Sequence, residues 1–150
     1  MSITLNAGWS WFSLNVVPAD PSVVTVFSGL DLVQGDQLKS QSHFTDFYPG
    51  YGFYGMLTTL STDEMFSVLL SSSATLKVSG APVSLPKTTF LNSGWTYLPC
   101  PYQCTMPISS GAPSFGYAQG SEIKSQVSFS EYYDGYGWFG PLTTMDPGMG

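Results

Sequence analysis

QGDQLKSQ at residues 34–41 and FTDFYPGYGFYG at residues 44–55 decide how this chain folds, because both stretches return 85 positions later. The second occurrences are QGSEIKSQ at 119–126 and FSEYYDGYGWFG at 129–140. About half of the aligned positions are identical, and most of the others keep the same chemical type. A match of this length at a fixed offset indicates an internal repeat, so we expect two copies of one module.

Two further pairs extend the match over most of each copy. LTTL at 57–60 returns as LTTM at 142–145 with the same offset. LNAGWSWF at 5–12 returns as LNSGWTYL at 91–98, 86 positions later, so the second copy is one residue shorter between these blocks. A loop absorbs such a change in length at little energetic cost.

The composition predicts short strands joined by tight turns. Aromatic residues make up 15% of the chain, charged residues only 9%, and there are 16 Gly and 11 Pro. We therefore expect an all-β fold, with two tandem repeats of a small β-sandwich or barrel-like module. Asp20 as a cap and Pro21 in the first turn allow one short helix in the first copy, whereas 112–115 leaves little room for a helix in the second. We expect Trp9 and Trp95, on the first strand of each copy, to lie in the core.

The two copies differ in length at their ends. The first module is expected at 1–79, a linker with two prolines at 80–87, and the second module at 88–150. By the offset, Met65 aligns with Gly150, so nothing in the second copy corresponds to the strands expected after Met65. An open sheet edge needs a partner. Three alternatives follow: the natural chain continues past Gly150, a strand from another subunit is added, or the second copy shares a strand with the first.

Charge excludes several classes of partner. The formal net charge is -6, and only 4 residues are Lys or Arg. We expect no nucleic-acid binding, which needs a basic surface, and no membrane partner, since no run approaches 18 apolar residues. The glycines around Tyr51 lack the Lys and the helix of a phosphate-binding loop, so no cofactor is expected.

The residues that carry catalysis or bind metals are scarce. His43 is the one histidine, and the second copy has Ser128 in its place. Neither a nucleophile–His pair nor a zinc site recurs in both modules, and we expect no enzyme activity. Cys100 and Cys104 could close a small disulfide loop in an oxidising compartment, or remain two free thiols in a turn.

The aromatic block is the strongest candidate site. Rings on a rigid glycine turn could stack on sugars or anchor a neighbouring subunit, and the alternative is that they fill the module core. Alternation along a strand cannot bury all of them. The candidate interface or glycan-stacking residues are Tyr48, Tyr51, Phe53, Tyr54, Tyr133, Tyr136, Trp138 and Phe139.

These motifs together resemble a family. LNAGWSW, GDQLKSQ and YGFYG resemble tandem modules with Gly-Trp-Asn-Trp and Ile-Lys-Ser-Gln motifs in large secreted proteins of bacteria and microbial algae. The resemblance covers nearly all of both copies. It implies a repetitive, fibril-forming or surface context outside the cell, and no catalytic activity. The second copy departs from the pattern at Pro99-Cys100-Pro101, where the first has Ser13-Leu14-Asn15.

We therefore expect a non-catalytic structural subunit of an extracellular or cell-surface assembly, such as a fibril or a surface layer. Its expected partners are copies of itself, joined by strand complementation and aromatic contacts. The alternative is a carbohydrate-binding module of a secreted protein, with glycans as partners.

Overall fold

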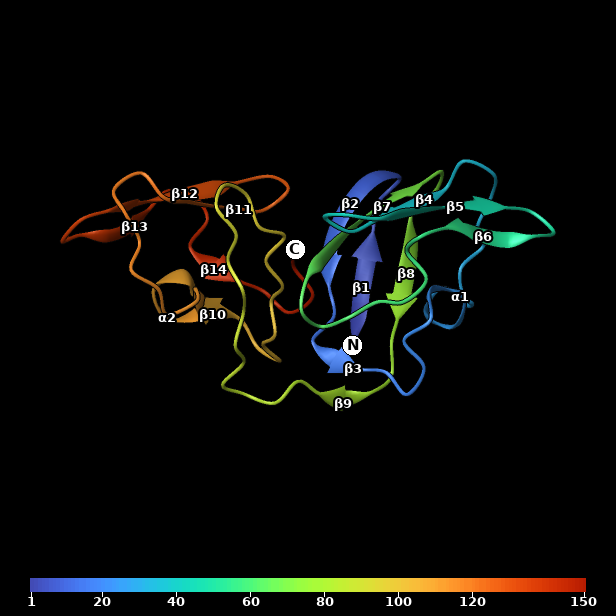
Figure 1. Cartoon of the computed structure of the whole chain (residues 1–150), viewed down its shortest axis with the longest axis horizontal. Helices are drawn as coiled ribbons and strands as arrows, with labels where there is room; N and C mark the ends of the chain where they lie inside the picture. The colour runs from blue at the N-terminus through green and yellow to red at the C-terminus, as the bar shows by residue number, and fades with distance from the viewer.

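The first copy is built on one antiparallel sheet of five strands. The computed structural model describes residues 1–150 and places these strands in the order β2-β7-β4-β5-β6 (Figure 1). Their bounds are β2 Gly8–Ser13, β4 Gln37–Lys39, β5 Phe44–Tyr48, β6 Gly52–Gly55 and β7 Met65–Leu70. β7 pairs antiparallel with β2 on one side and with β4 on the other, so β2 and β4 run parallel with one strand between them.

Two smaller strand pairs complete the first copy. β1 (Ser2–Leu5) pairs antiparallel with β8 (Ala74–Lys77), and β3 (Val16–Val17) pairs with β9 (Ala81–Pro82). A short turn joins β7 to β8, and residues 65–77 are called the closing arm below. One strand of this arm lies between β2 and β4 in the large sheet, while the other pairs with β1, so the arm connects both layers.

The core of the first copy lies between the large sheet, the β1–β8 pair and a short helix. Phe12 on β2 and Phe66 on β7 are fully buried, with ring centroids 5.7 Å apart, and Phe27 meets Phe12 edge-on at 6.1 Å. Strand alternation therefore buries Phe12 and turns Trp9 and Trp11 outward. The prediction that Trp9 and Trp95 lie in the core is wrong, because they are 37% and 56% exposed.

The helices are one turn long in both copies. α1 (Val23–Val26) begins after Ser22, whose hydroxyl accepts the Thr25 N–H at 3.3 Å. The predicted helix of the first copy is confirmed, but its cap is Ser22 rather than Asp20, which instead accepts the Ser22 N–H at 2.9 Å. The second copy also has a helix, α2 (Ile108–Gly111), 85 positions after α1, contrary to the expectation of little helix there.

The second copy repeats the aromatic half of the first. Its strands are β10 Met106–Pro107, β11 Glu122–Lys124, β12 Phe129–Tyr133, β13 Gly137–Phe139 and β14 Thr144–Met145. β11, β12 and β13 form one sheet in the arrangement of β4, β5 and β6, and β10 pairs with β14. The Val23 N–H to Thr58 carbonyl bond of 2.9 Å recurs as Ile108 to Thr143, also 2.9 Å. The expected all-β fold of repeated modules is confirmed.

The two copies contact each other reciprocally, as in a two-fold dimer. The Gln41 side chain accepts the Tyr97 N–H at 2.9 Å and donates to the carbonyl two residues earlier. The equivalent Gln126 accepts the Trp11 N–H at 2.9 Å and likewise donates to the carbonyl two residues earlier. Exchange of equivalent contacts defines an isologous interface, so a pseudo-two-fold axis relates the copies.

The overall shape follows from this axis. The β5–β6 and β12–β13 hairpins point to opposite ends of the molecule, with both termini between the two halves (Figure 1). None of the helices has the length and apolar character needed to cross a bilayer.

Candidate functional site

The hairpins β5–β6 and β12–β13, called the aromatic hairpins below, carry all eight predicted aromatic residues. In the first, Pro49 and Gly50 occupy the middle of a type II turn, with the Tyr51 N–H donating to the Tyr48 carbonyl at 3.0 Å and φ of Gly50 at 82°. A positive φ at this position favours glycine, which explains why Gly50 recurs as Gly135. The turn is thereby fixed, and the ring after it projects from the tip.

Six of these rings are exposed. Tyr51 is 93% exposed and its equivalent Tyr136 is 81% exposed, each at the far end of its own half. The other exposed rings are Tyr48, Tyr54, Tyr133 and Phe139. Each end of the molecule therefore presents a group of uncharged, flat side chains on a hairpin tip.

Two of the predicted rings have a packing role instead. Phe53 meets Phe27 and Phe47 edge-on at 6.0 and 5.4 Å. Trp138 meets Tyr117 at 4.8 Å and Tyr132 at 5.5 Å. These two rings hold their hairpins against the module, so they position the exposed rings rather than contact a partner.

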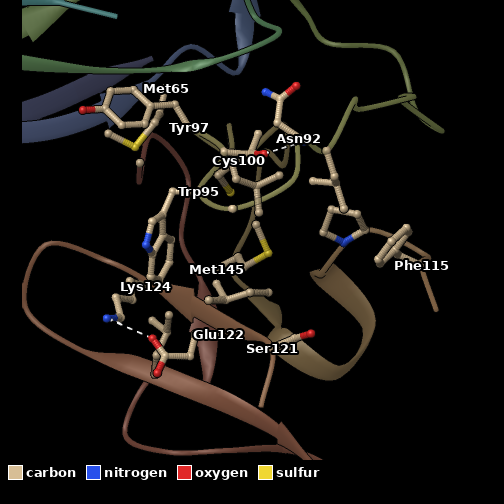
Figure 2. Close-up of a pocket in the computed structure, with 18 of the residues that line it drawn as sticks. Met65, Asn92, Trp95, Tyr97, Cys100, Phe115, Ser121, Glu122, Lys124 and Met145 are labelled. Carbon is tan, nitrogen blue, oxygen red and sulfur yellow. Dashed lines mark hydrogen bonds and ion pairs between the residues drawn. The ribbon is translucent and has the colours of Figure 1, made fainter. Parts of the chain in front are cut away.

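A groove runs through the second copy at the place that β7 occupies in the first. It has a volume of about 660 Å³ and lies between residues 94–99, which correspond to β2, and β11, which corresponds to β4 (Figure 2). Residues 94–99 form no strand although the equivalent β2 does. The physical reason is that β2 is paired with β7, and the second copy has no strand in that position.

The same cation–π contact joins the walls of the groove and the strands on either side of β7. Lys39 on β4 reaches over the Trp9 ring on β2, with Nζ 4.7 Å from the ring centroid. Lys124 reaches over the Trp95 ring across the groove at the same 4.7 Å, and the two residues face each other in Figure 2. In the first copy the single strand β7 lies between this pair, so the groove takes the place of one strand.

Backbone groups of β11 face the groove without partners. Ser121 accepts the Tyr132 N–H and Ser125 donates to the Ser128 carbonyl, so odd-numbered positions of this segment face β12. Alternation then turns the N–H and carbonyl groups of Glu122 and Lys124 toward the groove. An edge of this kind is a template for a further strand.

The floor of the groove is apolar and only partly covered. Leu98 and Ile123 line it and are half-buried, whereas their equivalents Phe12 and Leu38 are fully buried beneath β7. Leu142 and Met145, which remain buried, complete the floor. What the second copy leaves open is therefore the surface that β7 covers in the first.

Burial sets the ionisation of several groups near this surface. Removal from water raises the pKa of Tyr117 to about 12 and also raises the pKa of the Cys100 thiol. The Glu131 carboxylate raises the pKa of Tyr133 on the aromatic hairpin. The pKa values of all three groups are therefore moved further above neutral pH.

The remaining predicted residues do not form a polar site. Cys100 is buried and Cys104 is exposed, and both are free thiols in this structure. His43 is exposed and its Nδ1 lies 2.9 Å from the Ser42 hydroxyl. No three His, Cys, Asp or Glu side chains come together as metal ligands would.

Two functional features escape the sequence pattern alone. Gln41 and Gln126 recur in the Lys-Ser-Gln motif, but only the fold shows that each contacts the other copy. Thr88–Leu91 aligns with β1 when the offset of 86 is extended, yet it forms no strand, since β8 has no counterpart to pair with it. Extending the alignment to the first residues of the chain would have revealed this second unpaired segment.

No protein-family model, curated protein sequence or solved structure matches this chain.

Proposed function

We propose that this chain is a non-catalytic structural subunit of an extracellular assembly, a fibril or a surface layer. Neighbouring subunits are joined by strand complementation at the groove of the second copy and by contacts between aromatic hairpins. The observation that carries this proposal is the groove, which has an apolar floor and unpaired backbone edges and takes the place that the single strand β7 fills in the first copy.

The aromatic hairpins supply a second kind of contact. Tyr51 and Tyr136 lie in the turns of the two aromatic hairpins, which point to opposite ends of the molecule (Figure 1), so one subunit has two similar adhesive ends. Tyrosine is favoured at protein interfaces because its ring buries a large area with little loss of side-chain entropy. The net charge of -6 opposes association between copies, so the uncharged rings have to supply the attraction.

Sedimentation velocity over a wide range of concentration tests this function. We expect larger species as concentration rises, and we expect the double variant Tyr51→Ser with Tyr136→Ser to shift this association to higher concentration. The matched control is Val127→Ser, which removes a similarly exposed apolar side chain that lies away from the hairpin tips and does not line the groove. A chain that stays monomeric at high concentration, with the groove residues as protected from hydrogen exchange as β7, would rule out the assembly.

A carbohydrate-binding module is the second candidate, and the exposure of Tyr51 and Tyr136 favours it. Flat rings on fixed turns can stack on the apolar faces of sugar rings. We expect polysaccharide binding to be lost in Tyr136→Ala without unfolding. If a broad glycan panel gives no binding by calorimetry, this candidate is excluded.

A further inference from the structure

We infer that the groove accepts a two-stranded arm like residues 65–77 of the first copy, rather than a single strand. This inference rests on the proposed function and defines the donor: an apolar strand for the groove, a short turn, and a second strand that pairs with Thr88–Leu91. The donor is a segment outside residues 1–150.

The first copy shows where each strand of the donor would lie. In that copy Leu38 is paired with Val68 of β7, and Ser10 is paired with the same residue from the other side. By the repeat offsets, the donor's equivalent of Val68 lies between Thr96 and Ile123. The first donor strand therefore runs antiparallel to both walls of the groove.

Side-chain alternation then specifies the chemistry of the first donor strand. Phe66, Val68 and Leu70 belong to the core cluster, so donor residues at these positions face the floor of the groove and are apolar. Ser67 lies on the other face, and in the second copy that position lies near the Lys124–Trp95 contact. A small uncharged residue fits there, because a cation would repel Lys124.

The second donor strand has its own unpaired template. β1 is paired with β8 along its length, from Ser2 with Lys77 to Leu5 with Ala74. The corresponding residues 88–91 have no backbone hydrogen bonds, and Leu91 is half-buried where Leu5 is fully buried. A single strand in the groove would leave this segment unpaired, whereas a two-stranded arm would complete both layers.

The first copy anchors the turn of its closing arm with a carboxylate that the second copy lacks. In the first copy the buried Asp36 carboxylate accepts the Ser71 N–H at 2.8 Å and the Ser71 hydroxyl at 2.9 Å. The second copy has Ser121 at this position, at the edge of the groove. A hydroxyl offers a weaker acceptor than a carboxylate. We therefore expect a donor arm to bind the groove and dissociate from it, while the closing arm of the first copy stays in place.

The closing arm of an identical subunit is a poor donor. Residues 1–150 contain two positions for a closing arm, one in each copy, but only one arm. If one subunit gave its arm to the groove of an identical subunit, the position in its own first copy would become empty. The donor is therefore an arm that lies outside residues 1–150. Purified chain consequently leaves the groove open to an added peptide.

Peptide binding to the full chain tests the inference. The probes are fluorescein-labelled peptides with the sequences of residues 64–78 (both strands) and 64–71 (the first strand alone), and a 64–78 peptide with Val68→Asp. By fluorescence anisotropy, we expect the two-stranded peptide to bind, the single strand to bind at least about tenfold more weakly, and the Val68→Asp peptide not to bind.

A proline in β11 shows where the peptide binds. Glu122→Pro removes an N–H that faces the groove and leaves the β12 pairing intact, so it is expected to abolish binding, while Glu122→Ala keeps the N–H and is expected to retain it. Equal binding of both peptides would overturn the two-stranded donor and leave strand complementation standing. If neither binds, or if binding survives Glu122→Pro, the groove takes no strand, and the proposed function fails with the inference.

Discussion

The contact between the copies can be tested by removing one glutamine at a time. Gln41→Ala removes two hydrogen bonds to backbone groups of the second copy, one of them 2.9 Å long from the Tyr97 N–H. Gln126→Ala removes the two equivalent bonds to the first copy. A hydrogen bond contributes about 0.5–1.5 kcal/mol net, and both side chains are exposed to water, so each variant is expected to lose about 1–2 kcal/mol.

The pseudo-two-fold axis also predicts how the stability losses of the two variants compare with each other. Because the two contacts are equivalent, the two variants should agree within about 0.5 kcal/mol, and their effects should add in the double variant. In the double variant we also expect the calorimetric transition to broaden or split, since the two halves lose their mutual support. The matched control is Gln34→Ala, which removes an exposed glutamine with no side-chain hydrogen bond and should change stability by less than about 0.5 kcal/mol.

The measurement is urea unfolding followed by tryptophan fluorescence, with differential scanning calorimetry on the same samples. A chain of this size is expected to lose about 2–4 °C in Tm for each kcal/mol. If Gln41→Ala and Gln126→Ala are both as neutral as Gln34→Ala, the reciprocal interface does not form in solution. If one costs over about 1 kcal/mol more than the other, the contacts are not equivalent and the two-fold relation fails.

Three further predictions concern the interior and the hairpins. Asp36→Ala leaves three donors without their buried acceptor and should cost about 3 kcal/mol in urea unfolding, whereas the exposed Asp31→Ala should be neutral. Burial raises the pKa of Tyr117 to about 12 from its ordinary value near 10. The stability that the neutral Tyr117 side chain contributes is therefore fully present below pH 10 and is lost as the pH rises through 12. Unfolding followed from pH 9 to 12 should therefore show a smaller decline in Tyr117→Phe than in the parent chain, and equal declines would contradict this assignment. Trp138→Ala should lower the free energy of unfolding by about 3 kcal/mol because the Trp138 ring packs against two others. Tyr136→Ala should keep the free energy of unfolding of the parent chain within about 0.5 kcal/mol, because the Tyr136 ring is exposed. If urea titration gave the larger loss for Tyr136→Ala, Tyr136 rather than Trp138 would be the ring that packs the hairpin.

Local patterns predicted the parts of the fold that local chemistry decides. Glycine positions in the aromatic block required turns, and Gly50 and Gly135 indeed adopt the left-handed backbone that such turns need. The alternation after Gly8 predicted a strand correctly, but alternation names two faces without saying which is buried. Phe12 took the inward face because the strand register opposes it to Phe66, and this register depends on residues more than fifty positions away.

The candidate site was predictable only in part for the same reason. A repeat offset identified the aromatic block, but it could not separate the exposed Tyr136 from the packed Trp138, which depends on contact with Tyr117 from another loop. The groove needed the fold as well. The alignment shows that nothing corresponds to β7, but only the walls at residues 94–99 and β11 show that its place is kept open.

The pseudo-two-fold axis has a consequence for the direction of growth. Units with two equal halves, stacked end to end through their hairpins, would give a filament that reads the same from either end. In this chain only one half carries the open groove, so each unit has a head and a tail. A filament of such units in register would be polar, and its two ends would differ in whether they can recruit the partner that supplies the arm.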